Sequence, residues 1–357
     1  MKRRAFTIIE LLVVVSIIAL LVGILLPALG KAREQSLLTR SIANLKEIGN
    51  AHAIYGAEWN DRQATWINDG IAQYGDDFIT AWQGFNDEMG AGGGVNEGHP
   101  QPTLGLDDSN ALWFFVEEFT QPFIFDGTFA GQGSYRYPNL YALNQYMNGR
   151  FYDEIWIAPK DRMVLSGIET IGCLDSPGDF CLGDGAVLAP SYSLSAAAMF
   201  NPQVFGAGDR DGNEGSFRDP WELPAGFRSP TVSTAAFPEL KTRTMEHHWL
   251  NGDVKAECNA NWPNQGPYNN CQPYFYNASI NSAPVAQFFD GHIEQVGVRN
   301  TYITHQRSIT QTGVGTYVDN SPFGNYYHNE GYDFINQVTS FHVFTTKGIK
   351  GKDIDPQ

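Results

Sequence analysis

The sequence predicts an α+β protein in which one long N-terminal helix packs on an antiparallel β-sheet head with long loops. Three observations predict this fold class. An uncharged apolar run near the start is long enough to cross a bilayer. An amphipathic helical pattern continues this run without a break. The remaining chain alternates short aromatic and β-branched runs with Gly, Pro, Asn and Asp, as strands and loops do.

Composition narrows the class of protein. The 357 residues are 42% hydrophobic and 17% charged, which is enough apolar material for a sizeable core. The formal net charge is −16, so nucleic acid is not expected as a partner. Sparse Lys and abundant Gly and aromatic residues favour a body outside the cytoplasm.

The apolar run from Leu11 to Leu29 spans about 30 Å of hydrocarbon when residues 6–9 are added to it. The basic residues MKRR precede it. By the positive-inside rule they place the N-terminus in the cytoplasm, so everything after Leu29 is expected on the other side of the membrane.

Three simpler interpretations of the apolar run each conflict with the sequence. A secretory signal peptide with a cleavage site near Ala28 would be weakened by an acid in its apolar region. A lipoprotein signal needs a cysteine at the end of the run, and the first cysteine is Cys173. A plain signal anchor accounts for everything except Glu10, because a carboxylate in hydrocarbon is costly.

The stretch RRAFTIIELLVVVSIIALLVGILLPAL resembles the N-terminal processing and methylation segment of type IV pilins and type II secretion pseudopilins. The resemblance implies that prepilin peptidase cuts between Ala5 and Phe6 and methylates the new amino group. Glu10 stands where the family has the Glu that meets this cation on a neighbouring subunit, and pairing lowers the cost of both charges in lipid. The family usually has Gly before the cut, where this chain has Ala5.

Pro27 lies inside the predicted helix, at a position where the family commonly bends it. Proline removes one backbone hydrogen bond and clashes with the preceding turn, which predicts a kink or a melted turn there. Small residues at Ser16, Ala19 and Gly23 would allow neighbouring helices to approach closely.

Beyond Leu29 the helical pattern becomes amphipathic, with an apolar stripe from Leu38 to Trp59 that should pack on a sheet. Asn60 and Asp61 mark its expected end. The whole helix from Phe6 would be about 80 Å long. The predicted organisation is a cytoplasmic leader at 1–5, a transmembrane helix at 6–30, the extramembrane half of the helix at 31–60 and a globular head at 61–357.

Three segments of the head have the clearest patterns of ordered structure, and they are 155–161, 191–200 and 285–297. In the last, Asp290 and Gly291 lie between alternating residues, which predicts a hairpin with a two-residue type I′ turn.

The body also resembles the large pilin-like proteins of planctomycete-type bacteria. The shared features are the processing segment, the long helix, a Pro-Lys-Asp-like strand at 159–161 and the Asp-Gly-His turn at 290–292. One branch of that group has a His ten positions before the Asp-Gly, where this chain has Ile280. No activity follows from this resemblance.

The four cysteines form two local pairs, Cys173 with Cys181 and Cys258 with Cys271. No CxxC occurs, and the spacing suits metal poorly, so two short disulfide-closed loops are expected if the head lies in an oxidising compartment. Four separate buried thiols are the alternative.

A calcium ion is a candidate ligand of the stretch GDRDGNEG, which offers oxygen ligands at Asp209, Asp211, Asn213 and Glu214. The spacing is not that of an EF-hand. Some secretion pseudopilins bind Ca²⁺ in a head loop; a solvated turn is the alternative here.

The chain has no HExxH, GxSxG, Walker or GxGxxG motif, so an enzyme is not expected. The expected function is a prepilin-like structural subunit of a type II secretion or type IV pilus-type assembly. It would be a single-pass inner-membrane protein with a periplasmic or extracellular head, and its partners would be the membrane, prepilin peptidase and other pilin subunits. The alternatives are a monomeric membrane-anchored receptor or glycan-binding protein and, more remotely, an anchored hydrolase.

Overall fold

The computed structural model describes residues 8–65, 138, 140–147, 149, 153–161, 165, 190–206, 229–246, 283–317, 342 and 345–355. Within these ranges the elements follow the order α1 (Ile8–Glu58), α5 (Leu140–Asn144), η2 (Glu154–Trp156), β1 (Tyr192–Leu194), α7 (Ala196–Met199), η4 (Val232–Thr234), β2 (Thr242–Glu246), β3 (Val285–Phe288), β4 (Ile293–Gln295), α8 (Val298–Thr312) and η6 (Gly348–Lys350). The long helix and the antiparallel sheet confirm the predicted α+β class.

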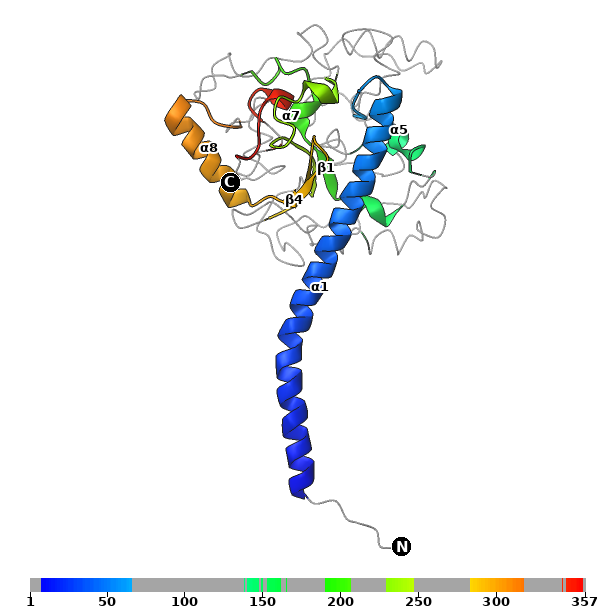
Figure 1. The fold of residues 1–357 in the computed structure, drawn as a ribbon, viewed down its shortest axis with the longest axis vertical. Helices are drawn as coiled ribbons and strands as arrows, with labels where there is room; N and C mark the ends of the chain where they lie inside the picture. Colours follow the sequence, from blue (N-terminus) through cyan, green and yellow to red (C-terminus); the bar gives the residue numbers. More distant parts are fainter. Residues whose placement is uncertain are drawn as a thin grey trace, which may run out of the picture.

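Helix α1 has two parts with different surroundings (Figure 1). It contains 51 residues, which corresponds to about 75 Å at 1.5 Å per residue. Residues 8–36 are exposed and project from the head as a stem, whereas the first fully buried residue is Ser41. The second part of α1 lies across the head beside the sheet.

The described sheet has four strands in the order β1-β2-β3-β4, each antiparallel to its neighbour. Every residue of β1, β2 and β3 is buried, whereas β4 is more exposed. The register between β2 and β3 shifts between Thr242 and Thr244, as at a β-bulge. Strand β3 is therefore paired on both edges and also faces α1.

The β3–β4 hairpin exists, but its predicted type I′ turn is wrong. The Phe288 N–H donates to the His292 carbonyl, so the loop between them has three residues. Of these three residues, Gly291 alone has a positive φ, at 89°. A type I′ turn needs positive φ at both central residues. Here the Gly291 N–H donates to the Phe288 carbonyl, and the Asp290 carboxylate accepts from the His292 N–H at 3.0 Å. The result is a type I turn closed by a left-handed glycine.

The segment 155–161 is ordered, but it does not form the strand that the resemblance implied. Residues Glu154–Trp156 form the 3₁₀ turn η2, and the Asp153 carboxylate caps it by accepting from the Ile155 N–H at 3.1 Å. Trp156 is completely buried. The Asp161 carboxylate accepts from the Ser191 hydroxyl at 2.6 Å and so links this segment to the start of β1.

The main hydrophobic core lies between α1 and the head, as the apolar stripe predicts. On α1 it contains Leu45, Ile48, Ala51 and Tyr55, all at most 2% exposed. Opposite them pack Leu143, Ile155, Trp156, Ile157, Tyr192 and Val285. Burial of this stripe is what holds the second half of α1 to the head.

The helix ends at Glu58 in a left-handed cap. Asn60 and Asp61 have φ of 53° and 67°, and the Asp61 N–H donates to the Gly56 carbonyl at 2.6 Å. This bond is the long one of a Schellman motif. Tyr146 fastens the same end, because its hydroxyl donates to the Glu58 carboxylate at 2.5 Å.

Candidate functional site

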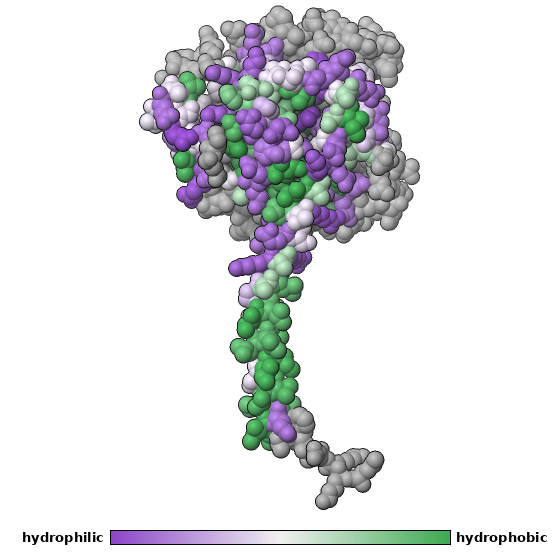
Figure 2. Space-filling model, viewed as in Figure 1, coloured by the Kyte–Doolittle hydropathy of each residue, from purple (hydrophilic) through white to green (hydrophobic). Residues whose placement is uncertain are grey.

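The stem of α1 (residues 8–36) carries the most distinctive surface of the described chain. Figure 2 shows apolar residues on the stem and mostly polar ones over the visible described surface of the head. Part of this helix is long and apolar enough to cross a membrane, and none of that part is buried. A surface this apolar is stable against lipid or other apolar helices rather than water. Because a helix satisfies its backbone hydrogen bonds internally, the stem is suited to span a membrane.

Glu10 lies in the first turn of α1 and is exposed, with Ile9 and Leu11 beside it. A carboxylate at this position faces the positive end of the helix dipole. Glu10 is therefore an exposed carboxylate near the N-terminal end of the described stem. Ala5 and Phe6, the expected cleavage residues, lie outside the described residues.

Pro27 lies inside α1, and helix is assigned on both sides of it. The structure shows no melted turn at this position, although α1 bends gently along its length (Figure 1). A kink at Pro27 itself stays a prediction. The Ser16 hydroxyl donates to the Leu12 carbonyl at 2.8 Å. This small polar residue therefore satisfies its hydroxyl within the helix.

A buried polar cluster joins α1 to the sheet. Ser41 contacts the Tyr192 hydroxyl at 2.9 Å and donates to the Glu246 carboxylate. Asn44 donates to the carbonyl oxygens of Glu154 and Ile157, each at 3.2 Å. These bonds are directional, so they set how α1 is rotated and how far it is inserted relative to the head. We call Ser41, Asn44, Tyr192 and Glu246 the junction cluster.

Burial shifts the pKa values of Glu246 and Tyr192 in the junction cluster. The pKa of Glu246 is raised, chiefly by desolvation, while the bonds from Ser41 and from the Val285 N–H act in the opposite direction. Burial also raises the pKa of the Tyr192 hydroxyl, with the Glu246 charge as the next cause. The cluster therefore favours neutral forms of both groups.

Sequence reasoning missed the junction cluster. The sequence contains only a weak sign of this cluster. Ser41 lies three residues after Leu38, on the apolar stripe itself, and Asn44 lies three residues after Ser41. Polar residues at such positions are read as breaks in the stripe. Only their partners on β1, β2 and η2 show that they are buried contacts.

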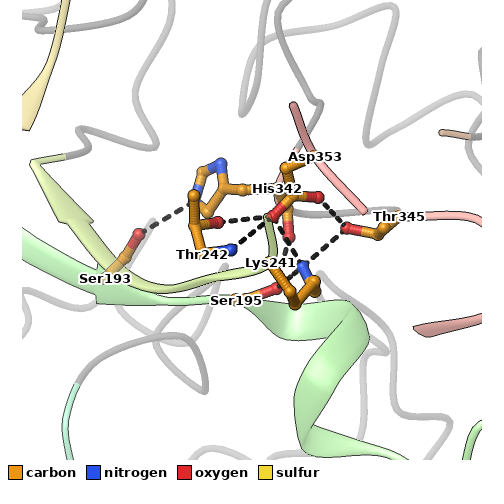
Figure 3. A network of polar contacts seen from close by, with 7 residues as sticks. All are labelled: Ser193, Ser195, Lys241, Thr242, His342, Thr345 and Asp353. Carbon is orange, nitrogen blue, oxygen red and sulfur yellow. Dashed lines mark hydrogen bonds and ion pairs between the residues drawn. The ribbon is translucent and has the colours of Figure 1, made fainter. Parts of the chain in front are cut away.

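A second polar cluster surrounds Lys241 and Asp353 (Figure 3). Both side chains are completely buried, and the Lys241 ammonium donates to Asp353 at 2.8 Å and to Ser195 and Thr345 at 2.7 Å each. Asp353 also accepts from the backbone N–H and hydroxyl of Thr242. All three donors of the ammonium are used within the protein. The arrangement fits a structural tie between the C-terminal segment and the sheet.

Several residues singled out in the sequence lie outside the described residues. They are the cysteines Cys173, Cys181, Cys258 and Cys271 and the candidate calcium ligands Asp209, Asp211, Asn213 and Glu214. Among the residues that are described, no group of three or more His, Cys, Asp or Glu side chains is arranged to hold a metal ion.

Comparison with known protein families gave a match at the N-terminus. A family model described as the prokaryotic N-terminal methylation motif matches residues 1–26. Curated protein sequences gave no match to the chain, and neither did solved structures. The match covers the expected cleavage residues Ala5 and Phe6, and it covers Glu10 and most of the apolar run of the stem.

Proposed function

We propose that the chain is a structural subunit of a type II secretion or type IV pilus-type assembly. The methylation motif indicates a prepilin-type subunit that prepilin peptidase processes. The chain also has a pilin-like α+β fold. The observation that carries the proposal is the stem of α1. It is an exposed apolar helix, joined without a break to a buried helix in the head.

The chemistry of assembly starts at the N-terminus. A cut before Phe6 frees a cationic amino group four residues ahead of Glu10. Four residues of helix rise about 6 Å, so the two charges on one subunit lie at slightly different depths. A second subunit shifted along the stem axis brings its terminus level with Glu10 of the first. Pairing then lowers the cost of both charges in lipid, which favours the staggered assembly over the free subunits.

The junction cluster supports the same function. Stems that pack side by side fix the position of their heads only if each stem is held at one rotation in its own head. The bonds from Ser41 and Asn44 supply that constraint at the point where α1 enters the core. A subunit of a regular filament needs such a rigid junction, whereas a simple membrane tether does not.

The basic residues before the stem support an orientation with the N-terminus in the cytoplasm and the head in the periplasm or outside the cell. Among the described residues, α1 is the one helix long and apolar enough to cross a membrane, which supports a crossing of the inner membrane by this stem.

The test replaces Glu10 by Ala in cells that express the full chain. We expect the variant to be cleaved and inserted but to lose filaments, as seen by electron microscopy and by native electrophoresis of membrane extracts. The matched control is Glu34→Ala, which removes an exposed acid from the same helix outside the apolar run. Normal assembly of the Glu10→Ala variant would contradict the proposal and favour a monomeric anchored receptor.

Mass spectrometry of the mature chain tests the processing step separately. A subunit processed as proposed begins at a methylated Phe6. A chain that still begins at Met1, or that begins at Lys31, would show that the leader is not handled by prepilin peptidase.

A further inference from the structure

A short charged segment at the end of the stem separates the apolar run from the head. The apolar run ends at Leu29, and contacts with the main core begin at Leu38. Residues 30–36, with the sequence GKAREQS, lie between these two points and are all exposed. Figure 2 shows the surface of α1 changing from apolar to polar just below the head. We call residues 30–36 the neck.

The length of the apolar run places the neck at the surface of a bilayer. From Leu11 to Leu29 the helix rises about 27 Å, close to the thickness of the hydrocarbon core. Lys31 and Arg33 follow about 3 and 6 Å beyond Leu29 along the helix axis. The headgroup layer on each side of a bilayer is about 5–8 Å thick. Both cations therefore lie at the depth of the headgroups when the stem spans the membrane.

Lys31 and Arg33 are exposed and are not used inside the head. In the part of the chain that the structure describes, neither side chain forms an ion pair or a hydrogen bond. The next basic residue of α1, Arg40, differs because it pairs with Glu154 of the head. The neck also contains Glu34, so its net charge is +1, whereas that of the whole chain is −16. An anionic surface therefore attracts the neck more than it attracts the rest of the protein.

The two cations of the neck have the donors that phosphate oxygens accept. The Arg33 guanidinium can donate two parallel N–H bonds to one phosphate, and the Lys31 ammonium acts as a compact charge. Residues two apart on a helix are separated by about 200° around its axis. Lys31 and Arg33 therefore reach different lipids on opposite sides of α1. Contacts on both sides oppose sinking and tilting of the stem.

We propose that the neck binds anionic phospholipids of the leaflet nearest the head, with Lys31 and Arg33 each bound to the phosphodiester of a separate lipid. This contact fixes the depth of α1 in the membrane. Glu10 lies 21 residues before Lys31, which is about 31 Å along the helix, so the same contact holds Glu10 at the opposite edge of the hydrocarbon. The proposal rests on the membrane crossing by the stem and does not require a filament.

The test measures lipid binding by the full chain in detergent, by native mass spectrometry. The probes are phosphatidylglycerol and phosphatidylcholine with the same acyl chains, so they differ only in the headgroup. The ratio of their two affinities is the quantity compared. Every protein in the comparison carries three changes ahead of the stem, so that the basic residues there do not contribute to the ratio. These changes are Lys2→Gln, Arg3→Gln and Arg4→Gln.

We expect phosphatidylglycerol to bind more tightly than phosphatidylcholine when the neck is unchanged. The ratio should fall about 10- to 30-fold in the Lys31→Gln/Arg33→Gln variant, because each basic side chain near an anionic lipid surface adds to the affinity. The matched control is Lys46→Gln/Lys350→Gln, which removes the same charge from exposed positions in the head and should keep the ratio.

Three results would overturn the proposal. They are equal affinities for the two lipids with the neck unchanged, an undiminished ratio in the neck variant, and an equal fall in the control. The last would mean that net charge, rather than the neck, accounts for the preference for phosphatidylglycerol.

A charge-exchanged variant separates the role of charge from an effect on the helix. Lys31→Arg/Arg33→Lys keeps both cations and should keep most of the ratio, whereas a loss as large as that of the Gln variant would contradict lipid binding by these charges. The measurement is made on single chains in detergent. A failure of Glu10→Ala to disrupt filaments would therefore leave its outcome unchanged, so the two proposals are tested separately.

Discussion

Glu246 shows how a single residue links stability to pH. Its carboxylate is 5% exposed and accepts from Ser41 and from the Val285 N–H at 2.9 Å. Desolvation outweighs these bonds and raises its pKa above the ordinary value of 4.5. The folded state therefore holds the Glu246 proton more tightly than the unfolded state does. Its contribution to stability is complete below pH 4.5 and is lost as the pH rises through the raised value.

Replacing Glu246 by Gln should remove this dependence, because an amide keeps one acceptor oxygen and does not ionise. The free energy of unfolding of the Gln variant should rise relative to that of the unchanged protein as the pH is taken from 4.5 upward. Thermal unfolding across a pH series measures the difference. Glu239→Gln, which makes the same substitution at an exposed position, is the control. A curve for Glu246→Gln that runs parallel to that of the unchanged protein would mean that Glu246 does not resist ionisation.

Lys241 and Asp353 form a buried ion pair, so removing one charge should destabilise the protein more than removing both. Lys241→Met leaves the Asp353 carboxylate buried without its cation, which should cost about 3–5 kcal/mol of unfolding free energy. The double variant Lys241→Met/Asp353→Asn removes both charges and keeps an acceptor for Thr242, so it should recover a large part of that loss. Chemical unfolding of the three proteins tests this. A double variant no more stable than Lys241→Met would contradict it.

Among the elements, α1 was the most predictable from sequence, because its apolar periodicity and its end at Asn60 and Asp61 are local features. Its close approach to the sheet was not predictable. A Cβ atom added to Gly49 would lie 1.8 Å from Nε2 of Gln287 on β3, so α1 and β3 touch where α1 has no side chain. A glycine in a helix is normally a weakness. At Gly49 it is required by the packing of two elements that are distant in the chain.

Gly49→Leu should separate α1 from β3 and lower the unfolding free energy of the head by about 1–3 kcal/mol, as overpacking does. Gly30→Leu is the matched control in the same helix, since no atom lies within 4 Å of a Cβ built there. Thermal unfolding of both variants in detergent gives the comparison. Equal midpoints for the two would show that Gln287 yields without cost.

The β3–β4 hairpin shows where local prediction stops. The alternating residues and the Asp290-Gly291 pair correctly indicate a hairpin. They do not determine its turn, because Asp290 can either adopt positive φ or use its carboxylate to accept the His292 N–H. The structure has the second arrangement. The rings of His292 and Phe288 also stack, with their centroids 4.1 Å apart.

At the scale of the whole molecule, the part of α1 before Leu37 is separate from the head, whereas the part after Leu37 belongs to the core of the head. Residues 8–36 are exposed, whereas Ser41, Asn44 and Leu45 lie in the core or the junction cluster. Removing residues 1–36 should therefore move the protein from the membrane fraction to the soluble fraction with the head still folded.

Removing residues 1–50 is the matched deletion, because it also takes away the junction contacts and the core residues Leu45 and Ile48. Its head should unfold at a lower temperature or fail to fold. Fractionation and circular dichroism of the two proteins test the prediction. Equal stability of the two heads would mean that α1 contributes little to the core.

The sequence by itself determined the membrane stem and the prepilin-type processing segment. A spanning helix satisfies its own backbone and needs only an uninterrupted apolar run, so its information is contained in adjacent residues. Only the tertiary structure decided which polar residues of α1 are buried and which residues of the head they contact. Those contacts join residues far apart in the chain, and burial changes the energy of a polar group only after the elements around it have packed.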